Sequence, residues 1–298
     1  MEKIILAIAY SFITFTLIGC SSTGVTTQIS ESHCKKNWAI CSLFPDRQIT
    51  SDYTPSVKIA VLDSGINKNA LGLSEQVTKS FNALDSSSTT SPEFSHGTMI
   101  ASIIVRNPQA EVNTMIGINS NVELFDVQVL NGKGSGKVED TIKGIKWSID
   151  QGVDIINISY GFSKENSDLE KVIKLAIDNG IVVVAAVGNT IGLSTDYPAK
   201  YPEVISISAI DSLQKKFLYA GKGKVDYVAP GVNVPVLNSD GEIELQSGTS
   251  FATAYATGVI SLMDQQKEIT EIKNILQSNA RYLGDSNVYG NGLIQFKE

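Results

Sequence analysis

Histidine and cysteine are scarce in this chain. Its 298 residues include two histidines, His33 and His96, and three cysteines, Cys20, Cys34 and Cys41. A structural zinc site takes four ligands, drawn mainly from Cys and His. Beyond residue 50 only His96 remains of this set, so the main body of the chain lacks the usual ligands for such a site. Any proton transfer by an imidazole in that part of the chain must use His96.

Positive charge is also limited. The chain has 24 Lys and Arg against 31 Asp and Glu, a net charge of −7 with histidine neutral. Nucleic-acid surfaces need clustered Lys and Arg to neutralise phosphates, so we expect no nucleic-acid partner. With 42% hydrophobic and 18% charged residues the chain is too apolar for disorder. A chain of this length can bury most of its apolar surface, and we expect one main globular domain and a monomer.

A long apolar run occurs at the N-terminus, over residues 4–18 after Lys3. It is short for a membrane-spanning helix and matches the charged and apolar regions of an export signal. The run ends in Leu17-Ile18-Gly19-Cys20, which resembles the lipobox of bacterial lipoproteins. That resemblance implies a signal peptide over residues 1–19 and a lipid on Cys20, with an uncleaved N-terminal anchor as the alternative. Either interpretation places the domain outside the cytoplasm, attached to a membrane of the cell envelope.

Residues 20–54 begin Ser/Thr-rich and show no periodicity, which is typical of a tether, so we place the folded domain at residues 55–298. Cys34 and Cys41 lie close together within this stretch. Because an extracytoplasmic compartment permits disulfides, we predict a local bridge between them, with two free thiols as the alternative. We expect His33, beside Cys34, to be a solvated linker residue.

Beyond residue 55 the pattern predicts an α/β fold. Short, β-branched and nearly all apolar runs indicate buried strands at residues 57–62, 122–129, 155–159, 181–186 and 204–210. Apolar residues at helical spacing predict a helix over 138–149, and the capping box Ser167-Asp168-Leu169-Glu170 opens another that Asn179-Gly180 can close. Alternating strands and helices indicate a mostly parallel sheet, whose active sites gather at the carboxyl ends of the strands.

Three reactive side chains lie where the predicted elements meet. Asp63 ends the first buried strand, His96 begins an apolar helical stretch, and Ser250 follows Gly248-Thr249 at the start of a helix expected to run to about Gln266. Taken singly they are typical of a turn cap, a structural histidine and a helix N-cap. Taken together they supply a nucleophile, a base and a carboxylate that orients the base.

With these motifs in this order, the chain resembles the subtilisin-like serine peptidases, the subtilase family. The resemblance covers about residues 57–280 and implies a subtilisin-like three-layer fold with a mostly parallel central sheet. It also implies that Asp63 orients the base, that His96 is the base and that Ser250 is the nucleophile. No cofactor is implied. Residues 106–115 offer only Asn107, Glu111 and Asn113 as obvious oxygen ligands, so we predict no calcium or other metal.

The resemblance extends to substrate binding. Asn189, after a predicted strand, matches the side-chain donor to the oxyanion. Two segments match those that bind an extended polypeptide by β-pairing: Gly134, Ser135, Gly136 and Ser159, Tyr160, Gly161. Alignment of the Tyr197-Pro198 segment brings Asp196 to the rear wall of the specificity pocket, where a carboxylate would favour Lys or Arg before the scissile bond. The alternative is that Asp196 is a solvated loop residue.

Three positions depart from the family pattern. Met99 stands where a second histidine is frequent, Phe251 where Met is common and Ala254 where Pro is usual. None removes a proton-transfer group, so we predict an active, lipid-anchored serine endopeptidase. A catalytically inactive, subtilase-like peptide-binding module remains the alternative. A nucleotide-binding domain is excluded, because no Gly-rich phosphate loop joins a predicted strand to a helix.

Overall fold

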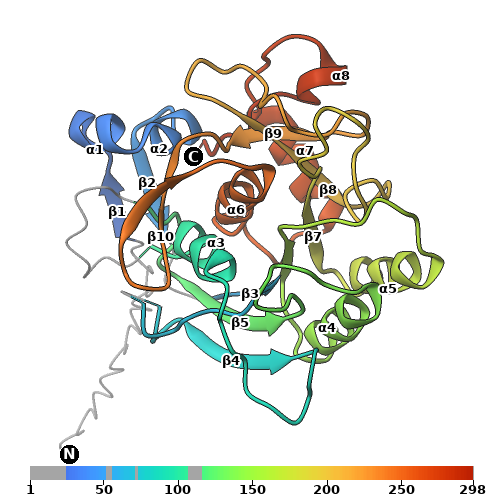
Figure 1. The fold of residues 1–298 in the computed structure, drawn as a ribbon. Coiled ribbons are helices and arrows are strands. Elements are labelled where there is room, and N and C mark those ends of the chain that lie inside the picture. The colour runs from blue at the N-terminus through green and yellow to red at the C-terminus, as the bar shows by residue number, and fades with distance from the viewer. Residues whose placement is uncertain (1–24, 52–55, 71–72, 107–115, 298) are drawn as a thin grey trace, which may run out of the picture.

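The computed structural model describes residues 25–51, 56–70, 73–106 and 116–297. Its centre is a parallel seven-stranded sheet in the order β4-β5-β3-β6-β7-β8-β9 (Figure 1). The strands are β3 (Val57–Asp63), β4 (Val77–Asn82), β5 (Val122–Gln128), β6 (Ile155–Ile158), β7 (Val182–Ala186), β8 (Ile205–Ile210) and β9 (Tyr227–Pro230). The sheet confirms the predicted α/β class.

Helices cover both faces of this sheet (Figure 1). One face packs against α3 (His96–Ile104) and α6 (Thr249–Ile260), and the other against α4 (Val138–Asp150) and α5 (Ser167–Asp178). Two further helices, α7 (Ile269–Asn279) and α8 (Ser286–Tyr289), follow near the C-terminus. The central strands β6, β7 and β8 are buried along their whole length, which explains why their sequences are apolar or small apart from Asn157 of β6.

Two helix ends differ from the sequence prediction. Helix α5 is capped by Asn166 and not by Ser167, since the Asn166 side chain accepts hydrogen bonds from Asp168 N and Leu169 N. Helix α6 ends at Ile260, before the expected end near Gln266. The side-chain amide of Gln265 folds back and donates to the carbonyl oxygens of Ile260 and Met263, at 2.8 Å each. These bonds satisfy carbonyl groups that a continuing helix would have used.

The predicted tether is wrong for residues 25–51, which fold onto the domain. They form β1 (Val25–Gln28), α1 (Glu31–Lys36), α2 (Trp38–Leu43) and β2 (Gln48–Ser51), and β1 pairs antiparallel with β2. The tether was predicted from the Ser/Thr content, but the segment also contributes apolar side chains to the core, namely Ile29, Ile40, Leu43, Phe44 and Ile49. His33 is not simply a solvated linker residue, since its Nδ1 accepts from Ser30 N in the capping box of α1.

The first two helices, α1 and α2, are linked to helix α6 by a hydrogen bond between side chains. A disulfide joins Cys34 in α1 to Cys41 in α2, with a Cα–Cα distance of 5.5 Å. Between them the buried Asn37 caps α2 by accepting from Ala39 N at 3.1 Å, and its Nδ2 donates to the Tyr255 hydroxyl of α6 at 3.3 Å. Figure 1 shows this unit lying beside α6 and the C-terminal end of the chain. Residues 25–51 therefore belong to the same folded body as the sheet.

A short antiparallel hairpin, β10 (Val234–Leu237) and β11 (Ile243–Gln246), leads into α6. Among the described residues no helix is both long and apolar enough to cross a membrane. The predicted signal peptide and Cys20 lie outside the described residues, as do residues 52–54 of the predicted tether and Asn107, Glu111 and Asn113.

Candidate active site

Asp63 and His96 form a close polar pair at the carboxyl edge of the sheet. Asp63 is the last residue of β3 and is fully buried, while His96 is the first residue of α3. His96 Nδ1 lies 2.8 Å and 3.0 Å from the two carboxylate oxygens of Asp63. A Cβ at Gly97 would lie 2.4 Å from the Gly65 carbonyl oxygen, so only glycine allows α3 to begin this close to the end of β3.

The Asp63 contact controls the basicity of the imidazole. Burial alone would lower the pKa of His96, but the charge of Asp63 and its hydrogen bond to the ring outweigh that effect and raise this pKa above its usual value. The same bond places a proton on Nδ1 when the ring is neutral, which leaves Nε2 free to accept one.

Ser250 lies in the first turn of α6. Its hydroxyl donates to the carbonyl oxygen of Ser159 at 2.6 Å, so in this conformation it is turned toward the segment that follows β6. His96 and Ser250 nevertheless line one cavity of about 210 Å³. Catalytic hydrogen bonds are often formed only in the substrate complex, so this rotamer is compatible with a nucleophile.

The same cavity collects most of the predicted site residues. Its walls include His96, Gly134, Ser159, Tyr160, Gly161, Asn189, Asp196 and Ser250. These residues follow separate strands of the parallel sheet or begin a helix beside it, as expected of a site at the carboxyl edge. Ser135 and Gly136 are not part of the wall; Gly136 forms an isolated antiparallel bridge with Leu130.

Asn189 is held by its side-chain oxygen. Its Oδ1 accepts from Thr249 N at 3.1 Å and from Thr249 Oγ1 at 3.2 Å. These two bonds hold the amide through its oxygen, so its Nδ2 is the atom left to act as a donor, and Asn189 lines the cavity wall together with Ser250. A side-chain donor beside a serine N–H is the arrangement that stabilises a tetrahedral oxyanion.

Asp196 forms part of the cavity wall and is half-buried. It packs against two glycines, because a Cβ at Gly161 would lie 2.5 Å from Asp196 Cβ, and one at Gly188 would lie 2.3 Å from Asp196 Oδ2. Burial raises the pKa of this carboxyl. The cavity therefore presents a partly desolvated acidic group.

Two phenyl rings enclose the imidazole. The Phe94 ring stacks on His96 at 5.9 Å between centroids and 6° between planes, and Phe251 lies 5.7 Å away at 53°. From the sequence, Phe251 is recognised only as a departure from the family pattern, and Phe94 is not recognised as part of the site. The available signal was its position two residues before His96, in the same loop. Together the rings restrict rotation of the imidazole and limit its access to water.

The fold and this cavity define an α/β protein with an Asp-His-Ser cluster at the carboxyl edge of its sheet. Residues 54–292 match the profile of the subtilase family. The chain therefore belongs to the subtilase family.

Individual relatives agree with this assignment. The chain is 36% identical to subtilisin amylosacchariticus of Bacillus subtilis subsp. amylosacchariticus over 257 residues, covering 81% of this chain and 65% of that protein. Subtilisin Savinase of Lederbergia lenta is 33% identical over 245 residues, which is 80% of this chain and 88% of that protein. The solved structure of Sphericase shares the fold at a TM-score of 0.79 and 22% identity, covering 88% of this chain and 98% of that one.

The Asp63 carboxylate should set the acid limb of activity. Because it raises the pKa of His96, the base becomes protonated and inactive as pH falls through a value above the usual imidazole pKa of about 6.5. We expect Asp63→Asn to move this midpoint to lower pH and to slow the reaction about 10,000-fold. The measurement is the rate of fluorophosphonate labelling against pH.

Asp126→Asn is the matched control for that experiment. Asp126 is also buried, in β5, and burial raises its pKa to about 6, close enough to produce an acid limb of its own. We expect its variant to keep the wild-type midpoint. A midpoint that follows Asp126, or that stays unchanged in Asp63→Asn, would contradict the assignment to His96.

Proposed function

We propose that this protein is a serine endopeptidase that hydrolyses extended polypeptides at the outer side of the cell envelope. The observation that carries the proposal is the hydrogen bond between Asp63 and His96, together with the cavity that His96 lines with Ser250 and Asn189. Membership of the subtilase family and relatives named subtilisin support it. The matched part of the chain spans about 65% of the length of the first of these relatives.

The reaction is acyl transfer in two steps. The Ser250 hydroxyl turns from Ser159 O toward His96, whose Nε2 takes the proton while Oγ forms a bond to the substrate carbonyl carbon. Collapse of the tetrahedral intermediate breaks the C–N bond, and His96 gives the proton to the leaving amine. Water then repeats the sequence, with His96 as base, and frees the acyl group and Ser250. Asp63 holds the ring in orientation and stabilises its charged form.

Two donors stabilise the oxyanion in each step. They are the side-chain amide of Asn189, fixed through its oxygen by Thr249, and the main-chain N–H of Ser250. Loss of one such donor costs about 100- to 1000-fold in rate.

The polypeptide binds as an added strand between the segments around Gly134 and Gly161. Glycine at both positions allows close approach of main chain, and strand addition gives affinity that does not depend on side chains. A Cβ at Gly134 would lie 2.8 Å from the Phe94 ring, so the first segment also needs glycine to pack beside this phenylalanine.

A second candidate function is peptide binding without cleavage. The observation that favours it is the Ser250 hydroxyl, which donates to Ser159 O. The residues that depart from the family pattern, Phe251 and Ala254, lie one and four residues after Ser250 in the same helix. A binding module needs neither a base nor an oxyanion donor, whereas His96 and Asn189, the candidates for these roles, line the same cavity as Ser250, so we favour the enzyme.

Labelling of Ser250 distinguishes these functions. We expect the full-length protein to form one covalent fluorophosphonate adduct by intact mass, because only an activated serine reacts. The Ser250→Ala variant should form none. A folded wild-type protein that forms no adduct and still binds extended peptides would establish the binding module instead.

We further propose that Asp196 selects Lys or Arg before the scissile bond. Its carboxylate lies in the cavity wall at partial burial, where a charge-assisted hydrogen bond to a substrate cation is strong.

The Asp196→Asn variant tests this preference. Hydrogen bonds to charged groups contribute about 1.5–3 kcal/mol, so we expect kcat/KM for Lys and Arg to fall about 10- to 150-fold, with little change for Leu. The measurement is a library varied at the residue before the scissile bond. Asp168→Asn, which alters an exposed carboxylate of α5, should leave the profile unchanged. A wild-type preference for Leu or Phe would remove the proposal.

Attachment to the envelope rests on the sequence Leu17-Ile18-Gly19-Cys20. We propose that the signal is cleaved before Cys20 and that this cysteine carries the lipid, which anchors the domain to a membrane on its extracytoplasmic side.

The Cys20→Ser variant tests the anchor. In cells fed a radiolabelled fatty acid, we expect the wild-type chain to be labelled and to sediment with membranes, and the variant to carry no label. Cys34→Ser removes a different cysteine and should remain labelled. Equal labelling of the Cys20→Ser protein would contradict lipidation at Cys20.

A further inference from the structure

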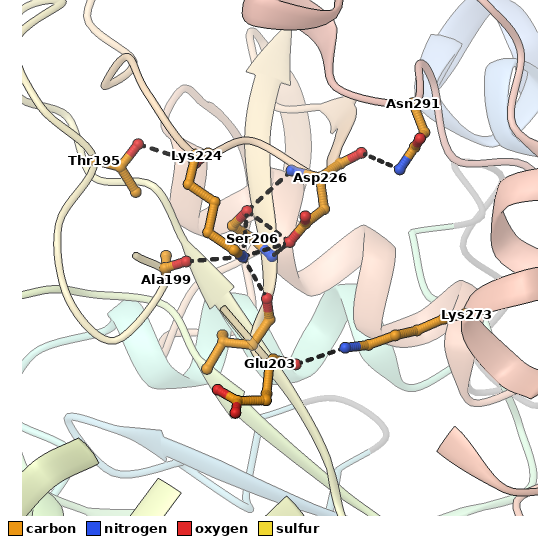
Figure 2. A network of polar contacts seen from close by, with 9 residues as sticks. Thr195, Ala199, Glu203, Ser206, Lys224, Asp226, Lys273 and Asn291 are labelled. Carbon is orange, nitrogen blue, oxygen red and sulfur yellow. Dashed lines mark hydrogen bonds and ion pairs between the residues drawn. The ribbon is translucent and has the colours of Figure 1, made fainter. Parts of the chain in front are cut away.

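The ammonium group of Lys224 lies in a cage of oxygen atoms. It donates to Val204 O and Asp226 Oδ2 at 2.6 Å each, and to Ala199 O and Ser206 Oγ at 3.2 Å each (Figure 2). An ammonium has three N–H bonds, so one of them is shared between two acceptors. The side chain is only 22% exposed. All three N–H bonds of the ammonium therefore have acceptors within the protein.

The cage joins two parts of the fold. Ser206 belongs to β8 and Asp226 immediately precedes β9, and the two are tied together because Ser206 N and Oγ both donate to Asp226 Oδ2 at 2.8 Å. Ala199 and Val204 belong instead to the segment that connects the cavity to β8. The Lys224 ammonium thus attaches this connecting segment to the rigid edge of the sheet.

The backbone of Lys224 holds the other end of the same segment. Thr195 Oγ1 donates to the Lys224 carbonyl oxygen at 3.0 Å, and Thr195 N donates to the Lys222 carbonyl oxygen at 2.8 Å. Asp196, the next residue, donates its N–H to Val187 O at 3.0 Å. Residues 195–204 are therefore fixed at the start by the main chain of Lys224 and at the end by its side chain.

We propose that Lys224 is a positioning residue for substrate selection, which holds residues 195–204 so that the Asp196 carboxylate stays in the cavity wall. This inference rests on the proposed role of residues 195–204 in forming the specificity pocket. Lys224 does not touch the Asp63–His96 pair or Ser250 in any hydrogen bond of the described structure. Its loss should therefore weaken substrate binding more than it slows the chemical step.

Burial makes the ammonium difficult to replace. Burial lowers the pKa of Lys224, and the charge and hydrogen bond of Asp226 act in the opposite direction. Removal of the ammonium would leave the Asp226 carboxylate and two carbonyl groups without this donor. We expect residues 199–204 to move in response, since Ala199 O and Val204 O would have to find water.

Lys273 provides a matched control on the same segment. Its Nζ donates to the carbonyl oxygen of Glu203 at 2.8 Å from helix α7, as Figure 2 shows. The Lys273 ammonium makes this one hydrogen bond at an exposed position, whereas the Lys224 ammonium makes four hydrogen bonds at a largely buried position. Lys273→Met therefore removes an ammonium from residues 195–204 without opening the cage.

The test compares Lys224→Met with Lys273→Met in the full-length protein. For the residue that the wild-type enzyme prefers before the scissile bond, we expect Lys224→Met to raise KM about tenfold or more, the effect of losing a hydrogen bond to a charged group. Both kcat and the rate of fluorophosphonate labelling should stay within about threefold of wild type, and Lys273→Met should change KM less than twofold. A KM in Lys224→Met equal to that of Lys273→Met would overturn the proposal.

The design separates this inference from the proposed function. If the library and Asp196→Asn show no preference for Lys or Arg, the role of Asp196 fails, and Lys224→Met is still judged on the residue that the enzyme does prefer.

If Lys224→Met does not fold by circular dichroism, Ser206→Ala replaces it, because it removes one of the four acceptors and keeps the ammonium. We then expect a KM about two- to threefold higher with kcat unchanged, and an unchanged KM would overturn the proposal.

Discussion

The contact between Asp63 and His96 is the constraint on which the rest of the site depends. It requires the end of β3 and the start of α3 to meet within hydrogen-bond distance, and Gly97 makes that approach possible. Because β3 and α3 meet at this point, the order of the strands in the sheet determines which other segments lie close to Asp63 and His96. Strand β6 lies next to β3, and β7 lies next to β6, so the segments that follow them bring Ser159 and Asn189 to the same edge. A buried carboxylate is costly without partners, and this one is satisfied by the imidazole and by the Ser64 N–H at 2.8 Å.

Helix α6 connects this edge to the opposite side of the domain. Ser250 in its first turn faces the cavity, and Tyr255 in the same helix is fully buried against Asn37 of the N-terminal unit. Helix α6 is buried almost throughout, so it has little freedom to adjust its position independently of what packs around it. The disulfide-linked helices α1 and α2 therefore support the element that carries Ser250, although they lie outside the family match at residues 54–292.

The buried strands can be predicted well from the sequence, and the exposed or interrupted elements only poorly. The strands β3, β6 and β7 are nearly all apolar, and such runs have few alternatives in a parallel sheet. Strand β4 was missed because it lies at the edge of the sheet and only its two ends are buried. Residues 25–51 were misinterpreted because their few apolar residues are buried by packing against distant segments, which no local pattern records. The pairing of Asp63 with His96 was predicted from their order and chemistry, whereas the Phe94 stacking and the Lys224 cage depend on loop geometry.

The partly or fully buried carboxylates of the fold differ in whether a cation of the protein pairs with them. Asp63 has His96, and Asp226 has Lys224, so the desolvation of each carboxylate is offset by a cation or a donor within the protein. Asp196 is partly desolvated as well, and burial raises its pKa, yet within the part of the chain that the structure describes no Lys, Arg or His forms an ion pair with it. A carboxylate in that state gains more from an arriving cation than a solvated one does, because the two charges meet where water screens them less. Among the described residues the buried Asp126 also lacks an ion pair, but Asp126 is not part of the cavity wall and Asp196 is. This difference is the physical basis for the proposal that Asp196 selects a basic side chain.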